Sequence, residues 1–210
     1  DINGITENIT NISIGSLVNH NEIANSNIIK NQLPGLSNLA SKIADNAVRN
    51  KGTLGGSICN ADPAADYPSA LVSLNAKINT NLREINARDF FIDMFETILE
   101  EGEIVTRVNF PKVTFTSYEK FSSQASKYAI VGVFFSVANQ KASVAITGAS
   151  NKVFLIEEIE SININKLRKF NLSKINFSKY DINSDINASS DYRISLIKSL
   201  INKSIINFYS

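Results

Sequence analysis

Polar and apolar residues follow two kinds of pattern in the first half of the chain. They alternate in segments that we predict to be strands, namely 11–17 and the two ends of 76–91. Apolar residues recur at helical spacing in segments that we predict to be helices, namely 19–30, 36–44 and a short helix or apolar turn at 69–76. Asp66 and Pro68 mark the start of the last segment, because an aspartate can cap free amides and proline suits a first turn.

Beyond Pro111 the pattern changes to paired strands, which indicates a second lobe. Its predicted elements are a β-hairpin, a helix, a stretch of loop and irregular helix, and a C-terminal amphipathic helix, at 129–149, 154–162, 161–188 and 189–210. The pair Asn139-Gln140 forms the hairpin turn, and Ser190 or Asp191 caps the last helix. The whole pattern predicts an α+β protein of two lobes.

Composition narrows the class of protein. The 210 residues are 43% hydrophobic with a formal charge of +1, so the chain can bury a core, and no excess of positive charge points to nucleic acid. The longest apolar run, at 129–138, is about half the ~20 residues that span a bilayer, so no membrane span is expected.

Cys59 is the single cysteine, which excludes an internal disulfide and suits the cytoplasm. No signal peptide is visible, and Asp1 suggests that upstream residues were removed or never included.

The segment RNKGTLGGSICNADPAADYPSAL at 49–71 concentrates glycine and proline in a polar run. Adjacent glycines let a backbone approach a ligand closely, and consecutive amides in such a turn form an anion-binding nest, with Thr53 and Ser57 as hydroxyl donors. The segment is neither a Walker A loop nor a Rossmann turn. Asp66 could accept hydrogen bonds from a ribose or a flavin ring. Taken alone, the glycine pair is more often a structural turn than a site.

The string VRNKGTLGGSICNADPAADYPSALVSLNA resembles the second flavin-binding segment of the medium, FAD-binding subunit of molybdenum hydroxylases, the group that contains xanthine dehydrogenases and carbon monoxide dehydrogenases. Further blocks extend the resemblance along nearly the whole chain: ISIGSLVNHNEIANS, DFFIDMFETILEEGEIV, YEKFSSQASKYAIVGV and NASSDYRISLIKSLI. It implies the second lobe of a PCMH-type FAD-binding domain over 1–112, followed by a C-terminal domain of antiparallel sheet and helices over 113–210. The family's first lobe, with its own Gly-Gly loop, would precede the matched region.

The resemblance also implies a function. The chain would bind FAD and pass electrons to an acceptor, while molybdopterin on a large subunit and 2Fe-2S clusters on a small subunit complete the complex. The flavin supplies the chemistry, so no catalytic residue is expected on this chain. The cofactor-binding positions carried over from the family are Thr53, Leu54, Gly55, Gly56, Ser57, Asn60, Asp66, Leu99 and Lys120. Lys120 would lie close to the ring and stabilise its reduced anionic form, unless it is a solvated strand-end lysine.

Several departures and alternatives stay open. Ser122, Ser123, Gln124 and Lys127 stand where family members commonly have arginines and an aspartate, which leaves the acceptor in doubt. His20, the single histidine, is expected to be structural. Another flavoprotein of the same binding fold, such as an enolpyruvyl-sugar reductase, is the alternative enzyme, although no proton donor for it is apparent. A scaffold subunit that has lost the cofactor is the alternative from another class.

Overall fold

The computed structural model describes residues 2–160 and 162–210. Its first sheet has the strand order β1-β2-β7-β3-β4, with all neighbours antiparallel. The strands are β1 (Ile5–Glu7), β2 (Asn11–Gly15), β3 (Lys77–Thr80), β4 (Glu84–Asn86) and β7 (Val105–Pro111). Alternation placed β2 correctly, since Ile12 and Ile14 are fully buried. The two strands predicted within 76–91 are β3 and β4, but residues 87–90 at the far end of that segment are helical. The sequence patterns did not reveal β7, which lies in the middle of this sheet.

Six short helices pack on this sheet or lie beside it. They are α1 (His20–Asn25), α2 (Asn27–Gln32), α3 (Pro34–Ser41), α4 (Asn46–Arg49), α5 (Leu54–Asn60) and α6 (Tyr67–Ser73). The predicted helix at 19–30 is two helices, because Ser26 has extended backbone angles and caps α2 with its side chain. Pro34 occupies the first turn of α3, so the helix predicted at 36–44 begins two residues earlier than expected, at residue 34. The predicted short helix at 69–76 is confirmed as α6, which starts at Tyr67.

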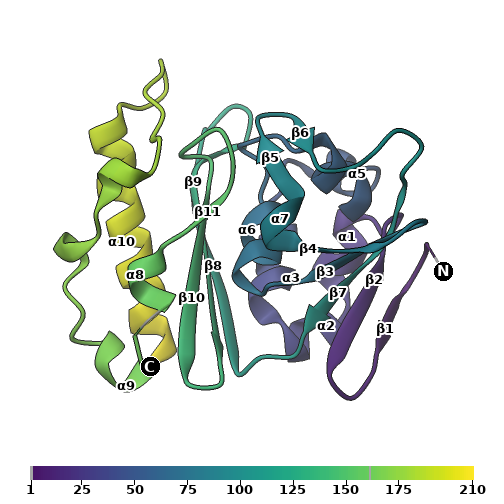
Figure 1. The fold of residues 1–210 in the computed structure, drawn as a ribbon, viewed down its shortest axis with the longest axis horizontal. Coiled ribbons are helices and arrows are strands. Elements are labelled where there is room, and N and C mark those ends of the chain that lie inside the picture. Colours follow the sequence, from purple (N-terminus) through teal and green to yellow (C-terminus); the bar gives the residue numbers. More distant parts are fainter. Residues whose placement is uncertain (1, 161) are drawn as a thin grey trace.

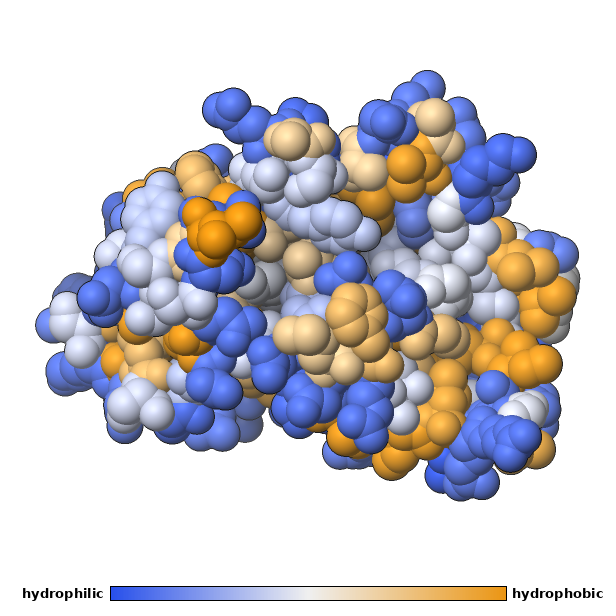
Figure 2. Space-filling model, turned by 90° about the horizontal axis from the view of Figure 1, so that it is seen from above, coloured by the Kyte–Doolittle hydropathy of each residue, from blue (hydrophilic) through white to orange (hydrophobic). Residues whose placement is uncertain are grey.

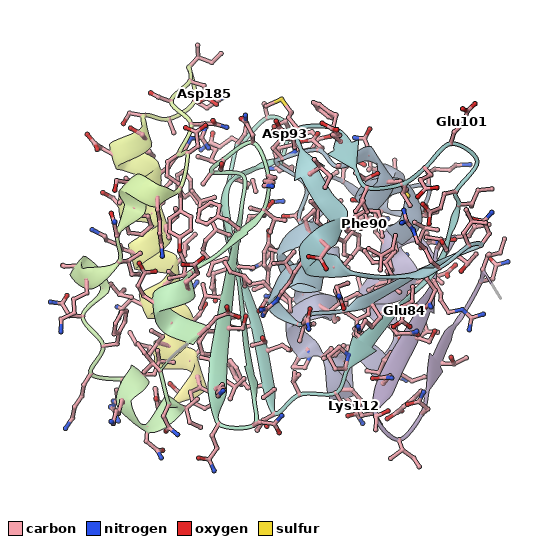
Figure 3. All side chains as sticks on the ribbon, viewed as in Figure 1. Glu84, Phe90, Asp93, Glu101, Lys112 and Asp185 are labelled. Carbon is pink, nitrogen blue, oxygen red and sulfur yellow. The ribbon has the colours of Figure 1, made fainter. Side chains whose placement is uncertain are left out.

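The second sheet has the order β11-β10-β9-β8 and is also antiparallel. Its strands are β8 (Phe115–Ser122), β9 (Ala129–Ala138), β10 (Lys141–Thr147) and β11 (Phe154–Leu155). The predicted hairpin is confirmed: Asn139 and Gln140 both have positive φ, at 50° and 60°, as a tight two-residue hairpin turn requires. A small hairpin of β5 (Phe91–Asp93) and β6 (Glu96–Thr97) follows the short helix α7 (Ala87–Phe90), and Glu101 projects outward from the loop after it (Figure 3).

The C-terminal part combines irregular segments with one long helix. Its elements are α8 (Glu157–Glu160), α9 (Ile164–Leu167), the 3-10 turns η1 (Leu172–Lys174) and η2 (Phe177–Lys179), and α10 (Ser190–Phe208). The predicted helix at 154–162 is wrong at its start, where β11 pairs with β10, and Ser161 lies outside the described residues. The cap of α10 is Ser189, one residue before the predicted position. Asp185, near the upper end of α10, pairs with the buried Arg193 at 2.7 Å (Figure 3).

Four layers follow one another across the molecule: α10, the second sheet, the pair α3 and α6, and the first sheet (Figure 1). Two hydrophobic clusters occupy the two faces of the second sheet. Phe134 on β9 belongs to the cluster that α3 and α6 share with the first sheet, whereas its neighbour Phe135 belongs to the cluster under α10. The antiparallel sheets and their helices confirm the predicted α+β class. In the described part of the chain, no helix has the length and apolar character that crossing a membrane requires.

Candidate functional site

A cavity of about 620 Å³ lies where the helices of the first lobe meet the loop between β8 and β9. Its lining residues are His20, Ile43, Ala44, Val48, Lys51, Gly52, Thr53, Gly56, Ser57, Asn60, Asp62, Ala65, Asp66, Ser126, Lys127 and Tyr128. Five of the nine predicted cofactor-binding residues are therefore brought together here: Thr53, Gly56, Ser57, Asn60 and Asp66.

The glycine segment forms a helix, although we expected an open turn. Thr53 caps α5, because its side chain accepts a hydrogen bond from Gly56 N at 3.1 Å. Gly55 packs against the preceding strand segment: a Cβ on it would lie 2.7 Å from the Cβ of Ser16. Gly56 faces the cavity, where a Cβ would meet only Thr53 Oγ1, at 3.1 Å. One glycine therefore serves packing, and the other keeps the cavity wall flat.

The predicted nest of free amides is wrong. In α5, Leu54 N donates to Val18 O at 3.0 Å and Gly55 N donates to Ser16 O at 2.8 Å. Gly56 N and the next amide both donate to atoms of Thr53. Because these amides already have acceptors inside the protein, an anion in the cavity would depend on side-chain donors. The hydroxyls of Thr53 and Ser57 and the exposed amide of Asn60 are such donors on this wall.

Asp66 forms the floor of the cavity and joins α6 to β8. Its Oδ1 accepts a hydrogen bond from the hydroxyl of Tyr118, and its Oδ2 pairs with Lys120 Nζ at 2.9 Å. The carboxylate was predicted to cap α6, but it makes no capping hydrogen bond, because these two partners hold it. Burial raises the pKa of Asp66, and the charge of Lys120 opposes that rise.

Lys120 lies behind Asp66. Its side chain is only 3% exposed, so the alternative of a solvated strand-end lysine is wrong. Nζ also donates to the backbone carbonyl of Lys42, at 3.2 Å. Because Asp66 neutralises the ammonium at close range, Lys120 acts on a ligand in the cavity only through this pair.

His20 is the first residue of α1 and lines the cavity from the side of Gly52. The residue is 5% exposed, and Nδ1 lies 3.1 Å from the hydroxyl of Tyr67, which is fully buried. Burial, together with the smaller effect of the nearby Arg49 guanidinium, lowers the pKa of His20 to about 4. The imidazole is therefore neutral near pH 7. The sequence had suggested a purely structural histidine.

The remaining predicted residues lie outside the cavity. Leu54 is fully buried beneath the glycine segment, and Leu99, between β6 and β7, is half-buried at the edge of the core. Tyr128, which pattern reasoning missed, lines the cavity from the β8–β9 loop. Its signal was weak, since it follows a polar loop and is itself exposed. No cluster of His, Cys, Asp or Glu suited to a metal ion occurs within 2–160 and 162–210.

The cavity combines polar and apolar side chains with a glycine-containing helix start, and its floor is the buried pair of Asp66 with Lys120. Concave sites of this composition are typical of proteins that bind a small molecule or cofactor. Comparison with known proteins identifies the family. Residues 1–113 match the model of the FAD binding domain in molybdopterin dehydrogenase. The chain belongs to this family, which confirms the resemblance seen in the sequence.

Relatives of known name agree with this assignment. The glyceraldehyde dehydrogenase medium chain of Sulfolobus acidocaldarius is 33% identical over 204 residues, covering 92% of this chain and 72% of the relative. The nicotine 6-hydroxylase medium subunit of Paenarthrobacter nicotinovorans is 29% identical over 209 residues, covering 93% and 74%.

Solved structures show the same fold. Quinoline 2-oxidoreductase from Pseudomonas putida superposes with a TM-score of 0.85 at 24% identity, over 98% of this chain and 77% of that chain. Reconstituted CO dehydrogenase from Oligotropha carboxidovorans gives the same score and identity over 96% and 76%. The predicted fold class, a PCMH-type FAD-binding lobe followed by an antiparallel sheet with helices, is thereby confirmed.

Proposed function

We propose that this chain is the electron-transfer subunit of a molybdenum hydroxylase complex, in which FAD bound to the chain passes electrons from iron–sulfur clusters to an acceptor. The observation that carries the proposal is the cavity of about 620 Å³, because five residues matched to the family's cofactor-binding segments line it together. The family match over 1–113 supports the FAD, and the names of the relatives, which are medium chains and subunits, support a place in a complex.

The residues of the cavity fit a dinucleotide. Hydroxyls of Thr53 and Ser57 and the amide of Asn60 can donate to phosphate oxygens, and Gly56 leaves room for them. Asp62 and Asp66 offer acceptors in the same cavity. The flavin, when bound, supplies the redox chemistry. The protein binds and orients it, and the buried pair of Asp66 with Lys120 fixes the geometry of the floor.

The partners in this proposal are a large subunit with the molybdenum cofactor and a small subunit with 2Fe-2S clusters. Support comes from apolar side chains exposed on the β5–β6 hairpin: Ile92, Met94 and Phe95 are 40%, 46% and 59% exposed. Figure 2 shows hydrophobic residues among hydrophilic ones on the face that carries this hairpin. The proposal also includes a cytoplasmic location, which the single cysteine supports. It further divides the chain into an FAD-binding domain at 1–112 and a C-terminal domain at 113–210.

The test of FAD binding is Gly56→Leu in the complete protein. The leucine would extend from the cavity wall into the space of the ligand, so we expect flavin content, read from the absorbance near 450 nm, to fall below about a tenth of the unmodified level. Cys59→Leu is the matched control, since Cys59 is exposed on the same helix but does not line the cavity. Equal flavin content in both variants would contradict the assignment of this cavity to FAD.

The place in a complex is tested separately. Expressed together with its neighbouring genes, the protein should elute from size exclusion with the molybdenum and iron–sulfur subunits. Replacement of Met94 and Phe95 by serine should weaken that association, because both side chains are exposed and apolar. A protein that carries FAD yet elutes only as a monomer would refute the subunit proposal and leave FAD binding standing.

A further inference from the structure

His20 is held beside the glycine segment by its backbone. Its amide donates to Gly52 O at 3.0 Å, and the preceding residue, Asn19, forms a β-bridge with Thr53. Both contacts attach the start of α1 to the residues that open α5. The imidazole therefore takes its position from the same piece of backbone that positions the predicted phosphate-side residues, and it lines the cavity next to them.

Tyr67 sets which nitrogen of His20 carries the proton. Its hydroxyl is fully buried, and within the described residues its single hydrogen-bond partner is Nδ1 of His20, at 3.1 Å. If Nδ1 carried the proton, the buried hydroxyl hydrogen would have no acceptor, which is unfavourable for a buried donor. The hydroxyl therefore donates to Nδ1, and Nε2 carries the hydrogen of the neutral ring.

Nε2 lies on the edge of the ring next to Gly52. A Cβ at position 52 would lie 2.5 Å from Nε2 and 2.9 Å from Cδ2, so any side chain there would cover this edge. No hydrogen bond to Nε2 occurs in the part of the chain that the structure describes. His20, which is only 5% exposed, thus keeps one donor without a partner among the described residues, at the wall of the cavity.

Both signs of charge line the cavity, through Lys51, Lys127, Asp62 and Asp66. Lys51 adjoins Gly52 in the chain, and Arg49 lies close enough to His20 to lower its pKa, so the surroundings of His20 include two cations. An anionic part of a ligand is therefore favoured near His20. The amides of α5 are already bonded within the protein, so a phosphate there needs donors from side chains.

We propose that His20 contacts the ligand directly, by donating its Nε2 hydrogen to a phosphate oxygen of the bound dinucleotide, with Tyr67 as the residue that fixes the tautomer. This inference rests on the proposed binding of FAD. It assigns to a histidine the task that the sequence had assigned to free backbone amides.

The experiment compares His20→Met with His20→Gln in the complete protein freed of cofactor. The two side chains have nearly the same length, but only glutamine can donate from the position of Nε2. Titration calorimetry measures the affinity for FAD and for ADP, which carries the phosphates without the flavin, and for riboflavin, which lacks them. We expect His20→Met to weaken FAD and ADP about ten- to a hundredfold and His20→Gln to stay within about threefold of the unmodified protein.

Controls separate this role from a structural one. Asn25→Ala, an exposed change on the same helix, should leave all affinities unchanged, and riboflavin affinity should be the same in every variant. Thermal unfolding without ligand checks the fold of each variant. If the methionine variant does not fold, Tyr67→Phe takes its place, because it leaves His20 present, and it should lower the affinity for FAD several-fold. Equal affinities of the methionine and glutamine variants, or an equal loss for riboflavin, would overturn the inference. If the unmodified protein binds no FAD, the proposed function itself is wrong.

Discussion

The buried pair of Asp66 with Lys120 allows a quantitative test of how the start of α6 is joined to the second sheet. At 2.9 Å and an effective dielectric of about 20, the attraction of the two charges is about 6 kcal/mol before desolvation is subtracted. Both side chains are nearly inaccessible to water, at 6% and 3% exposed, so desolvation cancels most of this gain. Removing one charge is different, because the other stays buried without its counterion.

We therefore expect Asp66→Asn to lower the free energy of unfolding by about 3–5 kcal/mol, since the ammonium of Lys120 remains buried. Lys120→Met should cost less, because the pKa of Asp66 is already raised by burial and the carboxyl can take up a proton. The double variant removes both charges, so its cost should be smaller than the sum of the single costs by about 1–3 kcal/mol.

Urea unfolding of the four proteins, followed by circular dichroism at pH 7, gives the required cycle. A matched exposed pair, Lys179 with Glu157, serves as control and should show a coupling below about 1 kcal/mol. Additive costs for the Asp66 and Lys120 variants would refute the reasoning, because they would mean that the two groups do not interact in the folded protein.

Three further outcomes are expected from stability measurements. The pKa of His20 is about 4 in the folded protein and 6.5 in the unfolded chain, so as the pH falls from 6.5 to 4 only the unfolded chain gains a proton. We expect the free energy of unfolding to fall by about 3 kcal/mol over that window. The variant His20→Gln should not show this loss. Gly35→Ala should cost about 1–3 kcal/mol in urea unfolding, because its Cβ would lie 2.8 Å from Ser117 N. Arg193→Met should cost about 3 kcal/mol by the same assay, since it leaves the partly buried carbonyls of Ile130 and Gly148 without the donor that the buried Arg193 supplies. A flat difference between the pH curves, or losses below about 0.5 kcal/mol, would contradict the respective argument.

Local patterns predicted local structure well. The 129–149 hairpin followed from one apolar run, one turn pair and a second apolar run, all adjacent in sequence. The C-terminal helix followed from its apolar stripe. By contrast β7 lies between two strands that are distant in the chain, so its central place depends on pairing that no single segment records. Its own sequence, VTRVNFP, mixes polar and apolar residues without a clear period.

Sequence reasoning predicted which residues line the cavity better than it predicted their conformation and hydrogen-bond partners. Thr53, Gly56 and Ser57 do line one cavity. The conformation of the segment was missed, because glycines disfavour helices and only tertiary contacts, such as that of Gly55 with Ser16, make one form here. Asp66 was expected to cap its own helix, but its partners stand 52 and 54 residues away and no spacing rule reveals them.

The second sheet is covered on both faces, by α3 and α6 on one side and by α10 on the other. A protease that cut the connection near Lys112 would therefore not release two soluble halves. Each half would expose a large apolar surface that the other normally covers, so the nicked pieces should remain associated as a complementing pair. For the same reason, expressing either half alone should yield insoluble protein, whereas expressing both from separate genes should restore the folded molecule. We therefore expect the segments 1–112 and 113–210 to fold together rather than independently.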